Sequence, residues 1–251
     1  MLGQTACAML IVASELAFSA PAMPASGVVA ISWDACDGPV RRSWSGPGPY
    51  SIYVSVLGID EPQKAYDIRV VYGDPSNRVP DAWAFQAGGC QAQLSPTGFV
   101  PEYVPPKSVA ATCPAFMGTS SPSLQIMDIR TNPPTDFNTM SLVRCVVANS
   151  YPHGVASMDA NTRYFLASFT FDHAVSVDGE GTAGSTCGGA STPMCFRLDS
   201  ASYLDMDGIE KPFDRPGTGY QLITFESDYA CSTEIPARPT TWGQIKSQYR
   251  R

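Results

Sequence analysis

Two consecutive segments between Tyr50 and Tyr72 constrain the fold most strongly. Each is rich in β-branched and aromatic residues, and the polar turn 60–64 separates them. In the second segment apolar residues alternate with the charged residues Asp67 and Arg69; the apolar positions are Tyr66, Ile68, Val70 and Tyr72. A period of two residues is the pattern of a strand with one buried face. The sequence therefore predicts that a β-sheet begins here.

Similar segments recur along the chain and predict an all-β fold. Further strands are expected at 27–33, 124–129, 142–148, 165–171, 195–198, 202–204 and 220–225. The clearest alternation puts Phe165, Ala167, Phe169 and Phe171 on one face. With 22 Pro, 21 Gly and only 16% charged residues, the composition favours short strands joined by turns over long helices. We expect a two-sheet antiparallel sandwich.

The chain divides into three expected parts. Residues 1–25 hold an apolar run and the small-residue sequence Ala20-Pro21-Ala22, which is the pattern of a signal peptide. Glu15 inside the run and the absence of Lys or Arg before Arg41 leave a disordered or buried N-terminal segment as the alternative. The sandwich is expected over 26–230, and a linker with a tail over 231–251. No transmembrane segment is expected, and the location is predicted to be extracellular or at the cell surface.

Cysteine usage supports export into an oxidising compartment. Without Cys7, seven of the 8 cysteines remain, no C-x-x-C pair occurs, and His153 and His173 are the only histidines, so neither a metal nor a cofactor site is expected. The expected disulfides are Cys187–Cys195 and Cys90–Cys113, with Cys36 and Cys231 as further candidates. Cys145 is expected to be a buried free thiol.

The tail carries the pattern of a short amphipathic helix. Thr241 and Gln244 have the spacing of a capping box, and Trp242, Ile245 and Tyr249 then recur at helical spacing. This C-terminal helix either binds an export or surface-attachment partner through those three residues or packs on its own sandwich. Both alternatives stay open at this point.

Charge and motifs exclude some functions. A net charge of −7 makes a nucleic-acid partner unexpected. The G-x-G-x-x-G match at 179–184 lacks the following helix that a dinucleotide site needs. The sequence 205–208 resembles part of a calcium loop but is better explained as a hairpin turn. No G-x-S-x-G motif gives His153 or His173 a serine partner.

Part of the chain resembles a known family. The sequences Tyr53-Val54-Ser55-Val56, Ala65 to Pro75 and Phe165 to Phe171 resemble strand motifs of cohesin modules, although Gly73 interrupts the expected Tyr-Asp-Pro. This resemblance implies a cohesin-like or jelly-roll-like sandwich. Residues 241–250 also resemble the T-W-G-x-I-K-x-x-Y-R tail of secreted bacterial proteins of unknown function, which implies a secreted protein without implying an activity.

Two classes of function remain. The first is a non-catalytic binding, scaffold or adhesion module that recognises an extracellular protein or glycan, and the sequence favours it because no catalytic constellation is evident. The second is an extracellular polysaccharide hydrolase that uses acidic residues of the loops as acid and base. Asp34 and Asp37 flank Cys36, but a solvated loop explains them better than a carboxylate pair. Two carboxylates gathered in one cleft would favour the hydrolase.

Overall fold

A computed structural model describes residues 26–75, 78–85, 90–91, 102, 104–116, 124–131, 141–148, 158–174, 176–177, 187–214, 222–226 and 231, and within 124–131 and 141–148 it describes the backbone. Two short helical elements have described bounds, η1 (Asp81–Trp83) and α2 (Lys107–Ala110), and the described residues 90–91 are also helical. None of the helices in these ranges is long and apolar enough to cross a membrane. The expected signal peptide and C-terminal helix lie outside the described residues.

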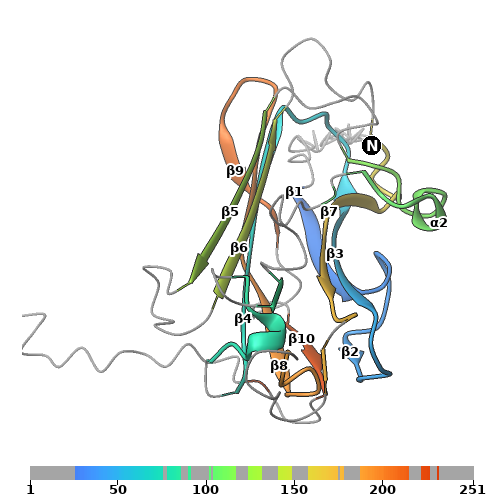
Figure 1. Ribbon diagram of the computed structural model, residues 1–251. Helices are drawn as coiled ribbons and strands as arrows, with labels where there is room; N and C mark the ends of the chain where they lie inside the picture. Colours follow the sequence, from blue (N-terminus) through green and yellow to red (C-terminus); the bar gives the residue numbers. More distant parts are fainter. Residues whose placement is uncertain are drawn as a thin grey trace, which may run out of the picture.

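The strands form two sheets that face each other (Figure 1). The smaller sheet has the order β1–β3–β7, and the larger has the order β2–β10–β8–β4–β6–β5, with β9 paired to the end of β8. The bounds are β1 Ser26–Trp33, β2 Arg41–Arg42, β3 Pro49–Ile59, β4 Ala65–Gly73, β5 Leu124–Thr131, β6 Ser141–Ala148, β7 Tyr164–Asp172, β8 Met194–Leu204, β9 Glu210–Pro212 and β10 Leu222–Phe225. Neighbouring strands are antiparallel except β2 and β10, which are parallel. The predicted all-β sandwich is confirmed.

The two strands that the sequence predicts first lie in opposite sheets. β3 is the centre of the smaller sheet, between β1 and β7, and β4 lies between β8 and β6 in the larger sheet. The turn 60–64 therefore connects the two layers instead of closing a hairpin. At its end, the backbone N–H of Lys64 donates to the carbonyl of Leu204 at 2.8 Å, which fixes the start of β4 against β8.

The core lies between the sheets and is largely aromatic. The alternating residues of β4 face it and are at most 2% exposed: Tyr66, Ile68, Val70 and Tyr72. Trp83, Phe171 and Phe196 meet there with ring centroids 5.0 to 5.6 Å apart. Edge-to-face and tilted contacts of this kind contribute beyond the burial of apolar area, by about 0.5–1.5 kcal/mol per pair.

Polar atoms on buried aromatic side chains connect the two sheets. The Tyr66 hydroxyl on β4 donates to the carbonyl of Leu166 on β7, and the Trp33 indole N–H on β1 donates to the carbonyl of Thr224 on β10 at 3.0 Å. Buried donors of this kind need a partner, because an unpaired one costs about 1–3 kcal/mol. These two bonds therefore favour one alignment of the sheets.

A bulge in β7 changes the alternation that the sequence predicts. Val54 is opposite Ala167, but Ser55 is opposite Phe165, so Leu166 is an extra residue in its strand. Leu166 joins the main core, whereas Phe165 lies in a second cluster on the other face of the smaller sheet. The prediction that Phe165 shares a face with Ala167, Phe169 and Phe171 is wrong at that one position, because a bulge advances the alternation by one residue.

The expected strands 195–198 and 202–204 form one continuous strand, β8. Arg69 is opposite Ser200 and Val70 is opposite Leu198, so Asp199 is an extra residue. The small and polar residues between the expected strands therefore mark a bulge and not a turn. The shift keeps both Phe196 and Tyr203 in the core on the inner face.

Three disulfides connect loops that are far apart in the sequence. The pairs are Cys36–Cys113, Cys90–Cys187 and Cys195–Cys231, with Cα–Cα distances of 6.3, 5.8 and 5.9 Å. The expected pairings Cys187–Cys195 and Cys90–Cys113 are wrong, because both joined cysteines that are near in sequence. Cys195 lies on β8 opposite Gly73, whereas Cys187 precedes that strand and lies beside Ser176.

Cys145 occupies a register position of β6 opposite Ile68, on the strand positions that face inward. Its side chain lies outside what the structure describes, so the buried free thiol stays a prediction. Cys231, the first residue of the expected linker, is 4% exposed and its disulfide attaches it to the start of β8.

We expect Phe169→Ala to lower the free energy of unfolding by about 3–5 kcal/mol, because Phe169 is 1% exposed and its loss leaves a cavity. Thr170→Ala, at the exposed neighbouring position, is the control and should lower it by about 1 kcal/mol at most, because it removes only the hydrogen bond to the Ser51 hydroxyl and a β-branched side chain. Urea unfolding followed by tryptophan fluorescence measures both. Equal effects of the two substitutions would show that the inward face of β7 is assigned wrongly.

Candidate functional site

The turn between β8 and β9 is held in one conformation by a buried carboxylate. Oδ1 of Asp205 accepts hydrogen bonds from the backbone N–H groups of Asp207 at 3.0 Å and Ile209 at 2.9 Å, and Oδ2 lies 2.9 Å from Nζ of Lys211. Gly208 supplies the positive φ of 81° that the turn requires. The hairpin turn expected at 205–208 is confirmed, and its carboxylate serves the turn itself.

Electrostatics keep the turn charged. The hydrogen bond from Lys211 and then the bond from the Ile209 backbone lower the pKa of the Asp205 carboxyl. The same hydrogen bond raises the pKa of Lys211. Glu61 adds a weaker contact, with its Oε1 at 3.6 Å from Nζ of Lys211. The ion pair therefore persists over a wide range of pH.

This ordered turn presents one large apolar side chain to solvent. Ile209 is 58% exposed, although its own backbone N–H is bonded to Asp205. A single exposed apolar residue is common on protein surfaces. An apolar residue on a turn whose conformation is already fixed loses little conformational entropy when a partner covers it. Ile209 is therefore suited to binding.

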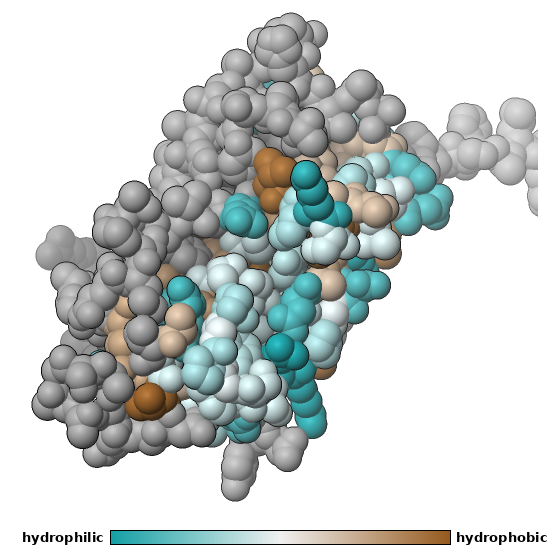
Figure 2. Space-filling view, turned by 45° about the vertical axis from the view of Figure 1, so that its right-hand side comes forward, coloured by the Kyte–Doolittle hydropathy of each residue, from teal (hydrophilic) through white to brown (hydrophobic). Residues whose placement is uncertain are grey.

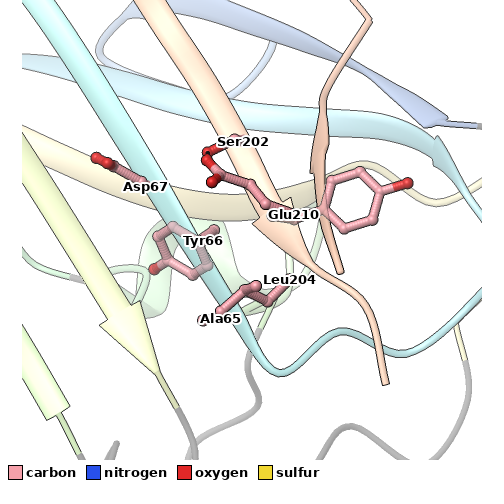
Figure 3. A pocket seen from close by; sticks show the side chains of 7 residues that line it. Ala65, Tyr66, Asp67, Ser202, Leu204 and Glu210 are labelled. Atoms are coloured by element: carbon pink, nitrogen blue, oxygen red, sulfur yellow. Dashed lines mark hydrogen bonds between the residues drawn. The ribbon is translucent and has the colours of Figure 1, made fainter. Parts of the chain in front are cut away.

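A small pocket lies beside the hairpin, with a volume of about 170 Å³. It is lined by residues of β4, β8 and β9: Ala65, Tyr66, Asp67, Ser202, Tyr203, Leu204 and Glu210. Figure 3 shows the side chains of Ser202 and Glu210 meeting over β8, whereas the side chain of Asp67 on the neighbouring β4 points away from them. Sites for drug-sized molecules typically measure about 300–1,000 Å³, so this pocket accommodates a group the size of one side chain.

The acidic groups of the pocket have partners within the protein. Oε1 of Glu210 accepts a hydrogen bond of 2.7 Å from the Ser202 hydroxyl, and Oδ2 of Asp67 lies 3.1 Å from Nη2 of Arg69. Both interactions orient the carboxylates on the outer face of the larger sheet. Together with Ile209, this pocket forms what we call the hairpin site.

The opposite end of the sandwich contains a buried histidine in an aromatic cluster. His173 is 0% exposed, and its ring centroid lies 4.4 Å from that of Trp83, 5.4 Å from that of Tyr50 and 5.7 Å from that of Trp44. Nδ1 lies 3.0 Å from the Ser176 hydroxyl, and Nε2 has no hydrogen-bond partner among the described residues. A neutral ring fits this arrangement, with Nδ1 accepting from the Ser176 hydroxyl and the proton on Nε2.

Burial gives this histidine an unusual pKa. Desolvation lowers the pKa of His173 to about 4, and the charge of the adjacent Asp172 opposes the shift only in part. The sequence suggested a residue at a strand end, and the structure places it immediately after β7, buried beside Tyr50 of β3 and Trp83 of η1. A ring sealed from solvent has no route to an external substrate, so we assign His173 to stability.

The remaining predicted site residues are placed as follows. Asp34 forms an ion pair of 3.2 Å with Arg42, so its carboxylate has a partner of opposite charge. Within the described part of the chain no three His, Cys, Asp or Glu residues could hold a metal ion together. His153, the 179–184 motif and the tail residues Trp242, Ile245 and Tyr249 lie outside the described residues, so the tail site stays a prediction.

Sequence reasoning missed the hairpin site. Asp207-Gly208 predicted the turn, but nothing in the sequence indicated that Asp205 would fix it or that Ser202 would bond to Glu210. The available signal was the apolar Ile209 directly after the turn signal Asp207-Gly208.

A comparison with solved structures finds cohesin modules among the chains that are similar to this one. The chain is similar to a cohesin module of a family 33 glycoside hydrolase from Clostridium perfringens, with 8% identity, coverage of 79% of this chain and 92% of that one, and a TM-score of 0.35. It is similar to a non-cellulosomal cohesin from Archaeoglobus fulgidus, with 10% identity, 79% and 89% coverage and a TM-score of 0.35. A type II cohesin domain from the cellulosome of Acetivibrio cellulolyticus gives 10% identity, 80% and 96% coverage and a TM-score of 0.37.

No family model and no curated protein matches the chain. The likeness to cohesin modules is therefore distant and structural. What the site does has to be argued from its own residues.

We expect the stability of the protein to fall between about pH 6.5 and pH 4 because of His173. Its folded pKa of about 4 lies below the unfolded value of 6.5, so in this window the unfolded chain binds the proton more tightly. The loss grows as pH falls, reaches at most about 3 kcal/mol near pH 4 and then stops growing. His173→Phe should lack this component. Urea unfolding at several pH values measures it, and a difference between the two proteins that does not change with pH would contradict the assignment.

Proposed function

We propose that this chain is a secreted, non-catalytic β-sandwich module that binds an extracellular protein through the hairpin site. The observation that carries the proposal is an apolar side chain, Ile209, exposed on a turn whose conformation Asp205 fixes. Binding sites gain affinity when their contact residues are ordered before the partner arrives. The adjoining pocket offers space for one side chain of that partner.

The surface chemistry favours a protein partner over a glycan. Sugar rings pack well on exposed aromatic faces, but the large apolar side chains that are exposed in the described ranges are all aliphatic: Val28, Val40, Val104 and Ile209. On the face in Figure 2, hydrophobic residues form small separate patches among hydrophilic ones. A protein interface combines such an apolar anchor with a polar rim, and Glu210 and Asp67 are placed to supply the rim.

Secretion is part of the proposal. The three disulfides are of a kind that forms and persists in oxidising compartments and is rare in the cytosol. The signal-peptide pattern of residues 1–25 supports the same location. An extracellular or cell-surface location would also place the hairpin site where it meets partners from outside the cell.

We expect Ile209→Asp to weaken partner binding about thirtyfold, because an anchor residue contributes about 2 kcal/mol or more. The control is Val40→Asp, which places the same charge at an apolar residue that is 51% exposed and outside the hairpin site. Partners captured from the surface fraction of the source organism are quantified against each variant, and melting temperatures verify folding. Equal capture by the two variants would show that the hairpin site is not the interface.

A hydrolase is the second candidate, because one pocket contains both Asp67 and Glu210. Glycoside hydrolysis uses two carboxyl groups about 5–10 Å apart, one of which donates a proton. Here each carboxylate already has a partner within the protein, Arg69 and Ser202 respectively, and the pocket is small for a sugar ring. The binding module remains the better explanation.

We expect the wild-type protein to release no more reducing sugar from polysaccharides than the double variant Asp67→Asn, Glu210→Gln, which removes both charges with little change in shape. A reducing-end assay on a panel of plant and bacterial polysaccharides measures this. Release that the wild type catalyses and the double variant does not would establish the hydrolase.

A further inference from the structure

The edge strands of the two sheets differ in how many of their outward backbone groups have hydrogen-bond partners. Beside β1, the backbone carbonyl of Asp214 accepts a hydrogen bond from the N–H of Val29 at 3.0 Å. The backbone N–H of Asp214 donates to the carbonyl of Gly27 at 2.7 Å. Beside β7, the carbonyl of Glu102 accepts from Ser168 at 2.9 Å, and Phe116 donates to the carbonyl of Phe165 at 2.8 Å. These contacts occupy backbone groups at both edges of the smaller sheet.

β5 is the contrasting edge. It pairs with β6 over all eight of its residues, and it stands at the end of the larger sheet. Within the described ranges, no strand or isolated bridge pairs with its other side. A long strand with one unpaired edge is a template for another strand, which proteins normally block with a cover, a proline or a bulge.

The charges of β5 occupy positions on the outer face of the sheet. Asp128 is opposite Arg144 of β6, and Arg144 is opposite Arg69 of β4, which lies on the outer face. Because strand residues alternate between faces, Arg130 lies on the same face as Asp128. Two opposite charges therefore stand two positions apart on an edge strand.

We propose that a second copy of this chain pairs with this edge, β5 against β5 and antiparallel, around a two-fold axis through Ile129. This register places Asp128 of each copy opposite Arg130 of the other, which gives two reciprocal pairs of opposite charge. Such cross-strand pairs stabilise a sheet, whereas like charges directly opposite destabilise it.

The other registers that keep the faces aligned lack this match. An axis through Asp128 sets Asp128 opposite itself, and an axis through Arg130 does the same for Arg130. An axis through Met127 sets Asp128 opposite Ile126. The self-complementary charge pattern thus selects both the partner and the register, because a one-residue shift would also exchange the two faces.

The dimer also has a consequence for binding, which rests on the proposed function. A two-fold axis perpendicular to a continuous sheet leaves the outer faces of both copies on the same side. Both hairpin sites lie on that side, so a dimer engages a surface that displays repeated partners with two sites at once. Such bivalent attachment exceeds the affinity of one site without any new contact.

The test uses charge reversal in the full mature chain. Asp128→Arg and Arg130→Asp each place like charges opposite one another twice, and each should weaken dimerisation about tenfold or more. Mixing the two variants sets a positive charge of one copy opposite a negative charge of the other at both pairs, so a heterodimer should form with nearly wild-type affinity. Asp81→Arg and Lys107→Asp, at exposed positions away from β5, are matched controls and should dimerise normally.

Sedimentation equilibrium measures the dissociation constants of the dimers. Hydrogen exchange of the backbone amides of residues 124–131 in the wild type tests the same edge without a substitution. This exchange should slow as the protein concentration rises. A wild type that stays monomeric at about 100 μM, single variants that still dimerise, or a mixture that stays monomeric would each overturn the proposal. No partner protein enters this experiment, so its failure leaves the test of the hairpin site unaffected.

Discussion

The sandwich depends on the burial of one face of β4. This strand has hydrogen-bonded neighbours along both sides, β6 and β8, and its inner face is closed off by the smaller sheet. A shift of one residue in its register would put Asp67 and Arg69 into the core and Ile68 into solvent, which no nearby partner would compensate. The registers of β6 and β8, and through them the outer strands, follow from that one requirement.

The parts of the structure that depend on neighbouring residues could be predicted from the sequence. The period of two in β4 gave its inner face directly, and the Asp207-Gly208 pair gave the hairpin turn, because both signals are local. The all-β class followed from many such local signals. The division of β3 and β4 between two sheets did not, since a five-residue connection fits a hairpin as well as a crossing between layers.

The features that could not be predicted depend on contacts between distant segments. The extra residues Leu166 and Asp199 exist because β7 and β8 must match particular neighbours, which their own sequences do not specify. The disulfide pairing follows the spatial order of loops, so Cys36 and Cys113 meet across a separation of 77 residues. The hydrogen bond between Ser202 and Glu210 is of the same kind, because it requires β9 to return beside β8 in one register.

β8 joins the core to the hairpin site, and the two ends of this strand differ in their response to acid. Near its start, Phe196 packs against Trp83, which in turn contacts the neutral ring of His173. Near its end, Asp205 keeps its charge in mild acid because Lys211 lowers the pKa of its carboxyl. Between pH 6.5 and 4 the unfolded chain gains a proton at His173 that the folded chain does not bind, so the stability falls, while the turn that presents Ile209 keeps its ion pair. The hairpin site therefore keeps its local geometry in mild acid for as long as the sandwich stays folded. A loss of binding in that pH range would then be caused by unfolding of the sandwich and not by a change in the turn.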